Sequence, residues 1–363
     1  MKILIADAFD DSLPGRLAPF GEVTQDPAKI AEAEVLLVRS KTKVTKEYLA
    51  GAPNLKLIIR GGVGLDNIDV EAARGRGIEV KNTPRASSVA VAELTMALML
   101  TVPNRIIEGH NGIKEGKFLK KELKRTELCG KTLGLLGAGL IGTEVARRAI
   151  AFGMRVVAHD HYISNHALAD MVEDDDELFA LSDYISIHLP LTPETKGMLD
   201  RHAFAKMKDG VIIVNTARGK VVVEEDLAEA LESGKVRAYA TDVFYSDPPD
   251  PSCPLLTAPN VIMTPHIGGS SKENLLRDHS ICGQFKSPGK FKQPAGSLGN
   301  FGSWAFTALA VPLGRGAVGH LWPSVEGAGK KRGSAVNSAR HFPASIPTRL
   351  HTLTFKEVTA HDN

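Results

Sequence analysis

The chain has 363 residues, of which 43% are hydrophobic and 24% are charged. This composition is that of an ordinary globular protein and excludes collagen, a coiled coil and wholesale disorder, and the length predicts two domains of about 100 to 200 residues each. The formal net charge of +2 hides an acidic body, because Lys and Arg outnumber Asp and Glu from Asp278 onward. An acidic body argues against nucleic acid as the main ligand.

The N-terminal segment, residues 1–7, is apolar for only a few positions before it becomes polar. It is too short for a signal peptide or a membrane span, so we expect a cytoplasmic protein with no membrane partner. The three cysteines, Cys129, Cys253 and Cys282, are far apart and lack the spacing of metal ligands. No metal site is predicted.

The first hundred residues alternate short apolar runs with helical patterns, which predicts a first α/β domain over residues 1–100. Such unbroken apolar runs are typical of parallel strands that are covered on both faces. The predicted strands are residues 2–6, 35–39, 57–60 and 78–80. Residues 89–101 carry apolar side chains at nearly every position and predict a largely buried helix, a candidate domain connector and subunit interface.

A second set of alternating strands and helices predicts a cofactor domain over residues 101–277. Its strands are expected at residues 132–136, 155–158, 184–188, 211–215, 238–242 and 261–264. The fold class is therefore α/β, with two doubly wound, Rossmann-like parallel sheets. Residues 278–363 are rich in Gly, Pro and Ser and basic, show no periodicity, and are predicted to be an irregular or disordered tail.

A Gly-x-Gly-x-x-Gly pattern lies where the strand 132–136 meets a helix. Gly137 is expected to make the tight turn, Gly139 to let a pyrophosphate approach, and Gly142 to let helix and strand pack closely. The helix N-terminus then faces the phosphates. Asp160 follows the next strand, where it can bind the adenosine ribose and repel a 2′-phosphate. The pattern predicts NAD as the cofactor.

Three ionisable residues follow later strands of the same sheet, namely Arg218, Asp247 and His266. Each alone has a plain reading as an ion pair, a turn residue or a loop histidine. Together they provide an arginine that binds a carboxylate, a histidine that exchanges a proton, and a carboxylate that orients the histidine. These are the groups that hydride transfer to a 2-oxo acid requires.

A second glycine turn, residues 60–69, closes a strand of the first domain. The free backbone N–H groups of Gly62, Val63 and Gly64 could surround a substrate carboxylate. A simple strand-to-helix turn explains this segment equally well.

From residue 1 to about 277 the chain resembles the D-isomer-specific 2-hydroxyacid dehydrogenases, most closely those that oxidise 3-phospho-D-glycerate. The motifs that carry the resemblance are Val38-Arg39-Ser40, Gly62-Val63-Gly64-Leu65-Asp66-Asn67-Ile68-Asp69, Asn82-Thr83-Pro84, Val91-Ala92-Glu93-Leu94, His188-Leu189-Pro190-Leu191-Thr192, Asn215 to Gly219, and Thr264 to Gly268. The resemblance implies that an NAD domain is inserted into the substrate domain, that the active site lies between them, and that the protein forms a homodimer or homotetramer.

The resemblance also assigns roles to individual residues. Arg218 and His266 are the implied catalytic pair, with Asp247 in place of the family's usual glutamate, and Arg39 and Arg60 are the implied phosphate contacts. The cofactor residues implied beside Gly137, Gly139, Gly142 and Asp160 are Leu140, Ile141, His188, Pro190, Thr192, Thr195, Thr216, Ala217, Arg218, Asp242, His266 and Gly268.

Two departures from the family pattern are visible. Asp247 is one methylene shorter than glutamate, which puts its reach to His266 in question. The family continues beyond Arg277 with an apolar helix that this chain lacks. We interpret the tail as a replaced terminus or a change of reading frame, a hypothesis that resequencing the gene would test.

The implied activity is NAD-dependent oxidation of 3-phospho-D-glycerate to 3-phosphooxypyruvate, which begins serine synthesis. One alternative is a glyoxylate, hydroxypyruvate or other D-2-hydroxyacid reductase, which needs no phosphate contacts. A second is an NAD-sensing corepressor that binds protein partners, although the retained Arg218, Asp247 and His266 speak against it. A third is a chain that the altered tail leaves poorly folded and inactive.

Overall fold

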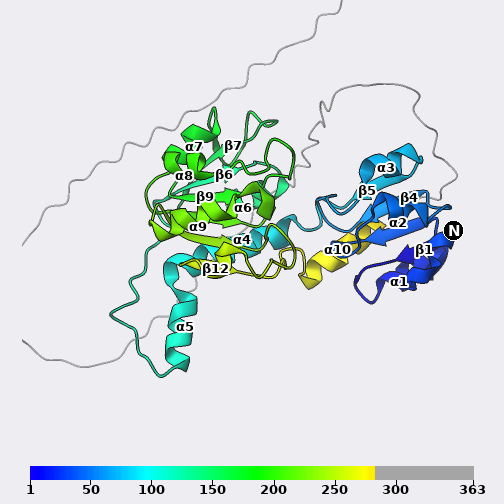
Figure 1. The fold of residues 1–363 in the computed structure, drawn as a ribbon, viewed down its shortest axis with the longest axis horizontal. Helices are drawn as coiled ribbons and strands as arrows, with labels where there is room; N and C mark the ends of the chain where they lie inside the picture. The colour runs from blue at the N-terminus through cyan, green and yellow to red at the C-terminus, as the bar shows by residue number, and fades with distance from the viewer. Residues whose placement is uncertain (283–363) are drawn as a thin grey trace, which may run out of the picture. The chain divides into compact units, whose positions relative to one another are not determined.

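A computed structural model of the chain describes residues 1–282, with side chains described up to residue 277. Within this range the chain forms two parallel β-sheets with helices packed on them (Figure 1). The fold class predicted from the sequence is confirmed. The tail predicted from residue 278 lies outside the described residues, apart from a short helical segment at its start.

The first sheet has five strands in the order β2-β1-β3-β4-β5. Their bounds are β1 Lys2–Ile5, β2 Glu22–Thr24, β3 Val35–Val38, β4 Leu57–Arg60 and β5 Glu79–Asn82. Four of them agree with the predicted strands within two residues, whereas β2, a short edge strand, was not predicted. Because β2 and β3 lie on opposite sides of β1, the chain changes direction there, and such a switch point is where doubly wound sheets bind ligands.

Both faces of the first sheet are buried. The strands alternate their side chains between two apolar clusters, one around Leu36 and Ile58 and the other around Leu37 and Ile59. The short helices that cover them are α1 Leu13–Leu17, η1 Ala18–Phe20, η2 Pro27–Glu32, α2 Lys46–Ala50 and α3 Val70–Gly75. Burial on both faces explains why these strands lack a polar alternation.

The second sheet has seven strands in the order β12-β11-β10-β9-β6-β7-β8. Their bounds are β6 Thr132–Leu136, β7 Arg155–His159, β8 Asp170–Met171, β9 Tyr184–Ile187, β10 Val211–Asn215, β11 Val236–Thr241 and β12 Val261–Met263. All pairings are parallel. Six strands were predicted, and the two-residue β8 was not. The switch point of this sheet lies between β6 and β9, directly beside the Gly-x-Gly-x-x-Gly turn.

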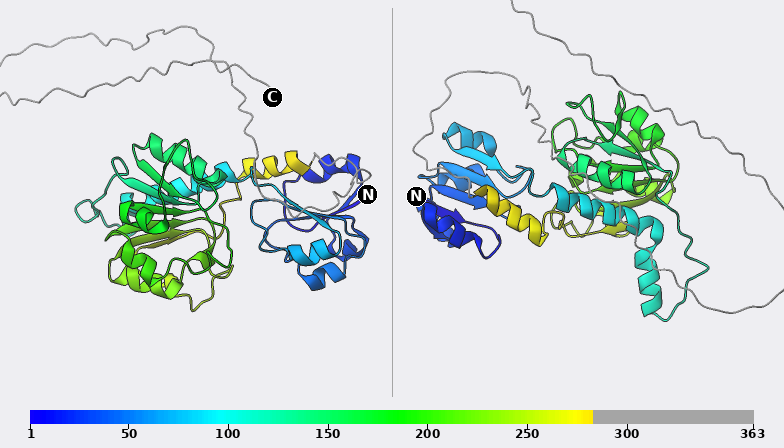
Figure 2. Two further views of the ribbon diagram at one scale, coloured as in Figure 1. Left: turned by 90° about the horizontal axis from the view of Figure 1, so that it is seen from above. Right: turned by 180° about the vertical axis from the view of Figure 1, so that it is seen from behind.

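Helices cover both faces of the second sheet (Figures 1 and 2). One cluster joins it to α4 Ser88–Asn104 and α6 Leu140–Ala151, and the other joins it to α7 Asp175–Leu181, α8 Arg201–Lys206 and α9 Glu224–Glu232. The short helices η3 Gly219–Val221 and η4 Pro254–Leu256 lie in its loops. The helix α10, Lys272–Cys282, was not predicted from the sequence.

The long helix α4 confirms the predicted helix over residues 89–101 but not its expected use as a subunit interface. Its buried side chains, Met96 and Met99 among them, belong to the core of the second sheet and pack within the chain. A group of exposed apolar residues instead follows α4, on α5 Ile106–Lys114 and just beyond it. They are Ile106, Ile107, Ile113 and Phe118, and α5 stands out from the sheet in Figure 1 and in the right view of Figure 2.

No single helix in the described part of the chain is long and apolar enough to cross a membrane. Only α4 and α5 taken together reach the required length and hydropathy, and they meet at a bend of 63°.

Candidate active site

A cleft of about 670 Å³ is lined by residues that follow strands of both sheets. The first sheet contributes the ends of β3 and β4, and the second contributes the loops after β9, β10, β11 and β12. Fourteen of the residues proposed from the sequence line it: Arg39, Arg60, Gly62, Val63, Gly64, Ile141, His188, Pro190, Thr216, Ala217, Arg218, Asp242, His266 and Gly268. The cleft therefore brings together residues that are remote in sequence.

Arg218 follows β10 and is held in the cleft from its own loop and from the first sheet. The buried Asn215 accepts from the Ala217 N–H at 3.0 Å and donates to the Arg218 carbonyl at 3.0 Å, which fixes the loop. The guanidinium donates from Nη1 to the Ala217 carbonyl at 2.6 Å, and from Nε and Nη2 to Asp66 Oδ2 at 2.8 and 2.6 Å. A positive charge thus lies inside the cleft.

Asp66, the partner of Arg218, belongs to the glycine turn after β4. Partial burial acts to raise the pKa of the Asp66 carboxyl, but the hydrogen bonds and charge of Arg218 outweigh this and hold that pKa below its usual value. Asp66 is therefore ionised at neutral pH, and the contact is an ion pair.

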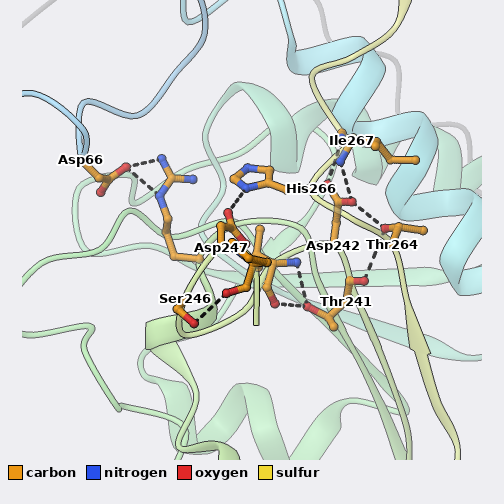
Figure 3. A network of polar contacts seen from close by, with 12 residues as sticks. Asp66, Thr241, Asp242, Ser246, Asp247, Thr264, His266 and Ile267 are labelled. Carbon is orange, nitrogen blue, oxygen red and sulfur yellow. Dashed lines mark hydrogen bonds and ion pairs between the residues drawn. The ribbon is translucent and has the colours of Figure 1, made fainter. Parts of the chain in front are cut away.

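His266 follows β12, and its imidazole Nδ1 is hydrogen-bonded to Asp247 Oδ2 (Figure 3). The shorter aspartate side chain therefore does reach the histidine. With Nδ1 engaged by a carboxylate, Nε2 is the ring nitrogen left to exchange a proton with a ligand. The backbone of His266 has φ = 54°, a left-handed conformation that is uncommon for a residue with a Cβ. Such strain persists only where neighbouring contacts impose it.

Asp242, at the end of β11, supplies those contacts. Its buried carboxylate accepts from Thr264 Oγ1 at 2.5 Å, from the Ile267 N–H at 2.8 Å and from the Gly268 N–H at 2.7 Å (Figure 3). These bonds hold the loop on both sides of His266. Sequence analysis placed Asp242 beside the cofactor, and the structure shows in addition that it orders the histidine loop.

The glycine turn after β4 is crowded by two guanidinium groups. A Cβ built on Gly62 would lie 1.5 Å from Arg60 Nη1, and one built on Gly64 would lie 1.6 Å from Arg218 Nη2. Arg39 lies in the same cleft and donates from Nη2 to the Gly269 carbonyl at 2.7 Å. The turn thus combines bare backbone with positive charge, which is a suitable environment for a small anion.

The Gly-x-Gly-x-x-Gly turn after β6 has the geometry that sequence analysis predicted. Gly137 has φ = 96°, and a Cβ on Gly142 would lie 2.4 Å from the Gly137 carbonyl oxygen. A Cβ on Gly139 would meet no atom within 4 Å, so the space above the N-terminus of α6 is open. A pyrophosphate fits an open position of this kind.

Asp160 follows β7 and faces the same turn. It accepts from the Ala138 N–H at 2.8 Å through Oδ2 and from the Tyr162 N–H at 2.9 Å through Oδ1. Oδ1 also accepts from the Ile163 N–H at 3.2 Å, so Oδ2 is the oxygen that has a further lone pair for a ribose hydroxyl. Asp160 therefore fits the role of ribose acceptor while it also braces the turn.

His188, directly after β9, lies beneath the glycine-rich turn and lines the cleft. Its carbonyl oxygen would be 2.9 Å from a Cβ on Gly137, and its Nε2 is 2.9 Å from Ser186 Oγ. Burial lowers the pKa of His188 to about 3, so the ring is neutral at physiological pH. Its buried Nδ1 has no hydrogen-bond partner among the described residues, as expected at a position that a ligand completes.

Several predicted cofactor residues are not among those that line the cleft. Thr192 and Thr195 are hydrogen-bonded to each other, and Thr195 Oγ1 donates to the Pro190 carbonyl, so in this structure they stabilise a local turn. Leu140 is exposed on α6. Thr216 does line the cleft, but its hydroxyl is 2.8 Å from Thr95 Oγ1 on α4 and serves to join helix and loop.

Residues 96–268 match the family described as "D-isomer specific 2-hydroxyacid dehydrogenase, NAD binding domain". The chain is also 52% identical over 246 residues to a hydroxypyruvate reductase of Thermotoga maritima, an alignment that covers 67% of this chain and 80% of the relative. The chain belongs to the D-isomer-specific 2-hydroxyacid dehydrogenase family. The members of this family are NAD-dependent oxidoreductases, and the seven-stranded sheet is their NAD-binding domain.

Other members of the family resemble the chain over a similar range. A D-3-phosphoglycerate dehydrogenase of Methanocaldococcus jannaschii is 46% identical over 285 residues, covering 75% of this chain but only 54% of that longer protein. The solved structure of a D-lactate dehydrogenase from Aquifex aeolicus, complexed with NAD and lactic acid, superposes with a TM-score of 0.69 at 32% identity. That superposition covers 77% of this chain and 93% of the other.

Sequence analysis missed some residues of this dehydrogenase cleft. Asp66 was quoted within the turn motif but received no role, because nothing local indicates that it pairs with a residue 152 positions later. Asn274 lines the cleft from α10 and donates to the Gly269 carbonyl at 2.6 Å. Ser40, Ser87 and Ser270 add hydroxyl groups. Of these three serines only Ser40 directly follows a predicted strand, residues 35–39, and that position was the one sequence signal for a cleft residue.

Proposed function

We propose that the chain is an NAD-dependent dehydrogenase of D-2-hydroxy acids that oxidises 3-phospho-D-glycerate to 3-phosphooxypyruvate, the step that begins serine synthesis. One observation carries this proposal. Arg218 and His266, whose imidazole is hydrogen-bonded to Asp247, line the same cleft as a glycine turn and two further arginines, Arg39 and Arg60. The cleft thus holds positive charge for two anionic groups beside an acid–base pair.

The cofactor is held by the second sheet. The N-terminus of α6 above Gly139 would hold the pyrophosphate, and Asp160 would accept from the adenosine ribose, while its charge disfavours a 2′-phosphate. When bound, NAD accepts a hydride from the substrate carbon. The remaining chemistry, the binding of the acid and the movement of its proton, belongs to the side chains of the cleft.

The substrate carboxylate is bound by the backbone N–H groups of Gly62 to Gly64 and by Arg218. The guanidinium also polarises the C2 oxygen and so stabilises the negative charge that it carries in the transition state. His266 Nε2 takes the hydroxyl proton as the C2 hydrogen leaves as hydride, and Asp247 stabilises the resulting imidazolium. In the reverse direction His266 returns that proton to the oxo group.

Arg39 and Arg60 are the proposed phosphate contacts. Arg60 lies over Gly62, and Arg39 Nε is buried without a hydrogen-bond partner among the described residues. A phosphate offers several acceptor oxygens, which suits two guanidinium groups at one end of a cleft. The corresponding position in a reductase of unphosphorylated acids needs no such charge.

Hydroxypyruvate or glyoxylate reduction is the second candidate, and the similarity to the hydroxypyruvate reductase, at 52% identity over most of that protein, favours it. Steady-state rates on phosphoglycerate, and with NADH on hydroxypyruvate, glyoxylate and pyruvate, separate the two. We expect kcat/KM for phosphoglycerate oxidation to fall at least about tenfold in Arg60→Gln, while hydroxypyruvate reduction changes little. Equal loss on both acids, or no turnover of phosphoglycerate, would refute the first choice.

The same experiment addresses the corepressor alternative. A histidine that exchanges the substrate proton contributes about 10²- to 10⁴-fold to the rate. If a His266→Ala variant keeps full turnover of every acid, His266 is not the proton-exchanging residue, and the result favours the corepressor alternative. Limited proteolysis and thermal melting of the wild-type protein test the alternative of a poorly folded chain.

We also propose that the protein is a homodimer or homotetramer. Ile106, Ile107 and Phe118, exposed on and after α5, are the apolar residues that association would bury. Light scattering of the wild type and of Ile107→Glu tests this, and a monomeric wild type would contradict it.

A further inference from the structure

The ion pair between Asp66 and Arg218 has no part in the reaction as described so far. Asp66 comes from the turn after β4 of the first sheet, whereas Arg218 comes from the loop after β10 of the second. Arg218 directs both Nε and Nη2 to a single oxygen of Asp66, at 2.8 and 2.6 Å (Figure 3). A fork of this kind fixes the plane of the guanidinium as well as its position.

The hydrogen-bonding capacity of Arg218 decides between two roles for Asp66. Asp66 takes the N–H of Nε and one N–H of Nη2, and the Ala217 carbonyl takes one N–H of Nη1. One hydrogen on each terminal nitrogen is left without an acceptor among the described residues. These two hydrogens can serve a bound acid while Asp66 stays in place, so Asp66 does not block the ligand site.

The turn that carries Asp66 is itself rigid. The neighbouring Asn67 is buried and donates from Nδ2 to the Arg39 carbonyl at 2.7 Å and to the Thr42 carbonyl at 2.8 Å. Its own carbonyl accepts from the Val44 N–H at 2.7 Å. The backbone of Asp66 is thus anchored to the first sheet. Gly64, which has no Cβ, leaves room for the Arg218 guanidinium to reach the Asp66 carboxylate.

We propose that Asp66 is a positioning residue, which holds the guanidinium of Arg218 across the cleft so that its remaining N–H groups face the carboxylate and oxo oxygen of the substrate. This inference rests on the proposed function, since it gives Arg218 the substrate to bind. In this role Asp66, although it lines the cleft, acts through Arg218 and not by its own contact with substrate or cofactor.

The chain supplies a matched control. Arg155 and Asp170, at the edge of the second sheet, form the same fork, with Nε and Nη2 of the arginine on one aspartate oxygen at 3.2 and 3.1 Å. Both side chains are exposed, at 57% and 67%, and neither lines the cleft. Asp170→Asn therefore removes an equivalent ion pair without touching the site.

The experiment compares wild type, Asp66→Asn, Asp66→Glu and Asp170→Asn as full-length proteins. It uses the 2-oxo acid that wild type reduces fastest with NADH, and it records kcat, KM, the Kd of NADH by fluorescence, the Kd of oxalate in the presence of NADH, and the melting temperature. Arg218→Lys and the double variant Asp66→Asn/Arg218→Lys complete a cycle. Oxalate serves as an unreactive carboxylate probe.

We expect Asp66→Asn to lower kcat/KM by about 10- to 100-fold, because a misplaced binding group loses transition-state contacts. Oxalate binding should weaken, NADH binding should change less than about twofold, and Asp66→Glu, which keeps the charge, should retain more activity than Asp66→Asn. Asp170→Asn should match wild type. In the Arg218→Lys background the Asp66 change should add little, since lysine has no fork to orient.

Other results overturn the inference. The inference fails if Asp66→Asn keeps full activity, or if it loses activity only together with NADH binding or melting temperature. It also fails if Asp66→Asn binds oxalate more tightly, which would show that Asp66 competes with the acid. A full loss in the Arg218→Lys background would also contradict action through Arg218. A wild type that binds NADH but reduces no 2-oxo acid overturns the proposed function and this inference together, whereas an active wild type matched by Asp66→Asn overturns the inference alone.

Discussion

The two glycine turns of the molecule follow parallel strands of similar sequence character, yet they prepare opposite kinds of anion site. The turn after β6 has free space above Gly139 and directly precedes the twelve-residue helix α6. The turn after β4 is covered by the guanidinium groups of Arg60 and Arg218. One site thus offers backbone N–H groups at a helix end, and the other offers side-chain charge. The kind of anion that a glycine-rich turn can bind therefore depends on the side chains that reach the turn from elsewhere in the chain.

Gly64→Ala is the variant with the largest expected effect, and it tests whether the turn after β4 serves the substrate acid alone. Its added Cβ meets the end of the flexible Arg218 side chain, at 1.6 Å, so the arginine must move while the fold can remain intact. We expect kcat/KM for the 2-oxo acid to fall about 100-fold, with NADH affinity and melting temperature nearly unchanged. Steady-state kinetics and NADH titration check this. A variant that loses NADH binding instead would show that the two turns are not separate.

Gly142→Ala tests the opposite turn at the point where it is packed against backbone. The new Cβ would lie 2.4 Å from the Gly137 carbonyl oxygen, which cannot rotate away as a side chain can. We expect the free energy of unfolding to fall by about 2 kcal/mol, the usual cost of overpacking, and NADH to bind more weakly. Chemical denaturation and NADH titration measure both. Unchanged stability would mean that the turn yields more easily than its contacts suggest.

Gly139→Ala tests whether the open position in the turn after β6 is the one that the cofactor occupies. A Cβ there meets no protein atom within 4 Å, and its backbone φ of −68° suits alanine. We expect the melting temperature without cofactor to stay the same, while NADH affinity falls about tenfold, equivalent to about 1.4 kcal/mol. Full NADH affinity in this variant would place the pyrophosphate elsewhere.

The smallest expected effect is on the pH dependence of the free energy of unfolding, and we expect it from His188, beside the cofactor turn. Burial lowers the pKa of His188 to about 3 from the usual histidine value of 6.5, so the unfolded chain binds more protons than the folded one between these values. His188 therefore contributes stability that is complete above pH 6.5 and is lost as the pH falls, by up to about 1.4 kcal/mol per pH unit. Denaturation at pH 7.5, 6.5 and 5.5 should show this slope in wild type and a smaller one in His188→Gln.

Asp66, at the substrate turn, adds nothing to that slope. Its pKa is held below the usual value, so its stabilising effect is complete above the unfolded carboxyl's pKa of 3.8 and is lost only under more acidic conditions. Identical slopes for wild type and His188→Gln between pH 6.5 and 5.5 would contradict the assignment to His188.

Much of this architecture could be predicted because the signals are local. Unbroken apolar runs predicted strands that are buried on both faces, and the spacing of Gly137, Gly139 and Gly142 predicted their turn. Arg218 and His266 could be placed together because each follows a strand of one parallel sheet, and parallel strands end at the same edge.

The features that were missed depend on tertiary contacts or on very short elements. The strands β2 and β8 have three and two residues, too few for a pattern. The pairing of Asp66 with Arg218 arises only when distant segments meet. Thr192 and Thr195, which a motif places at the cofactor, have local hydroxyl and carbonyl partners in this structure, and their part in cofactor binding stays a prediction.

The separate origins of Arg39 and Arg60 on one side and of Asp247 and His266 on the other have an evolutionary consequence. The first pair is encoded in the opening 60 residues and the second beyond residue 240. Under the proposed function, drift or recombination can then alter which acid is recognised and leave proton exchange untouched. New specificities can therefore arise from changes in the first sheet alone, without passing through an inactive ancestor.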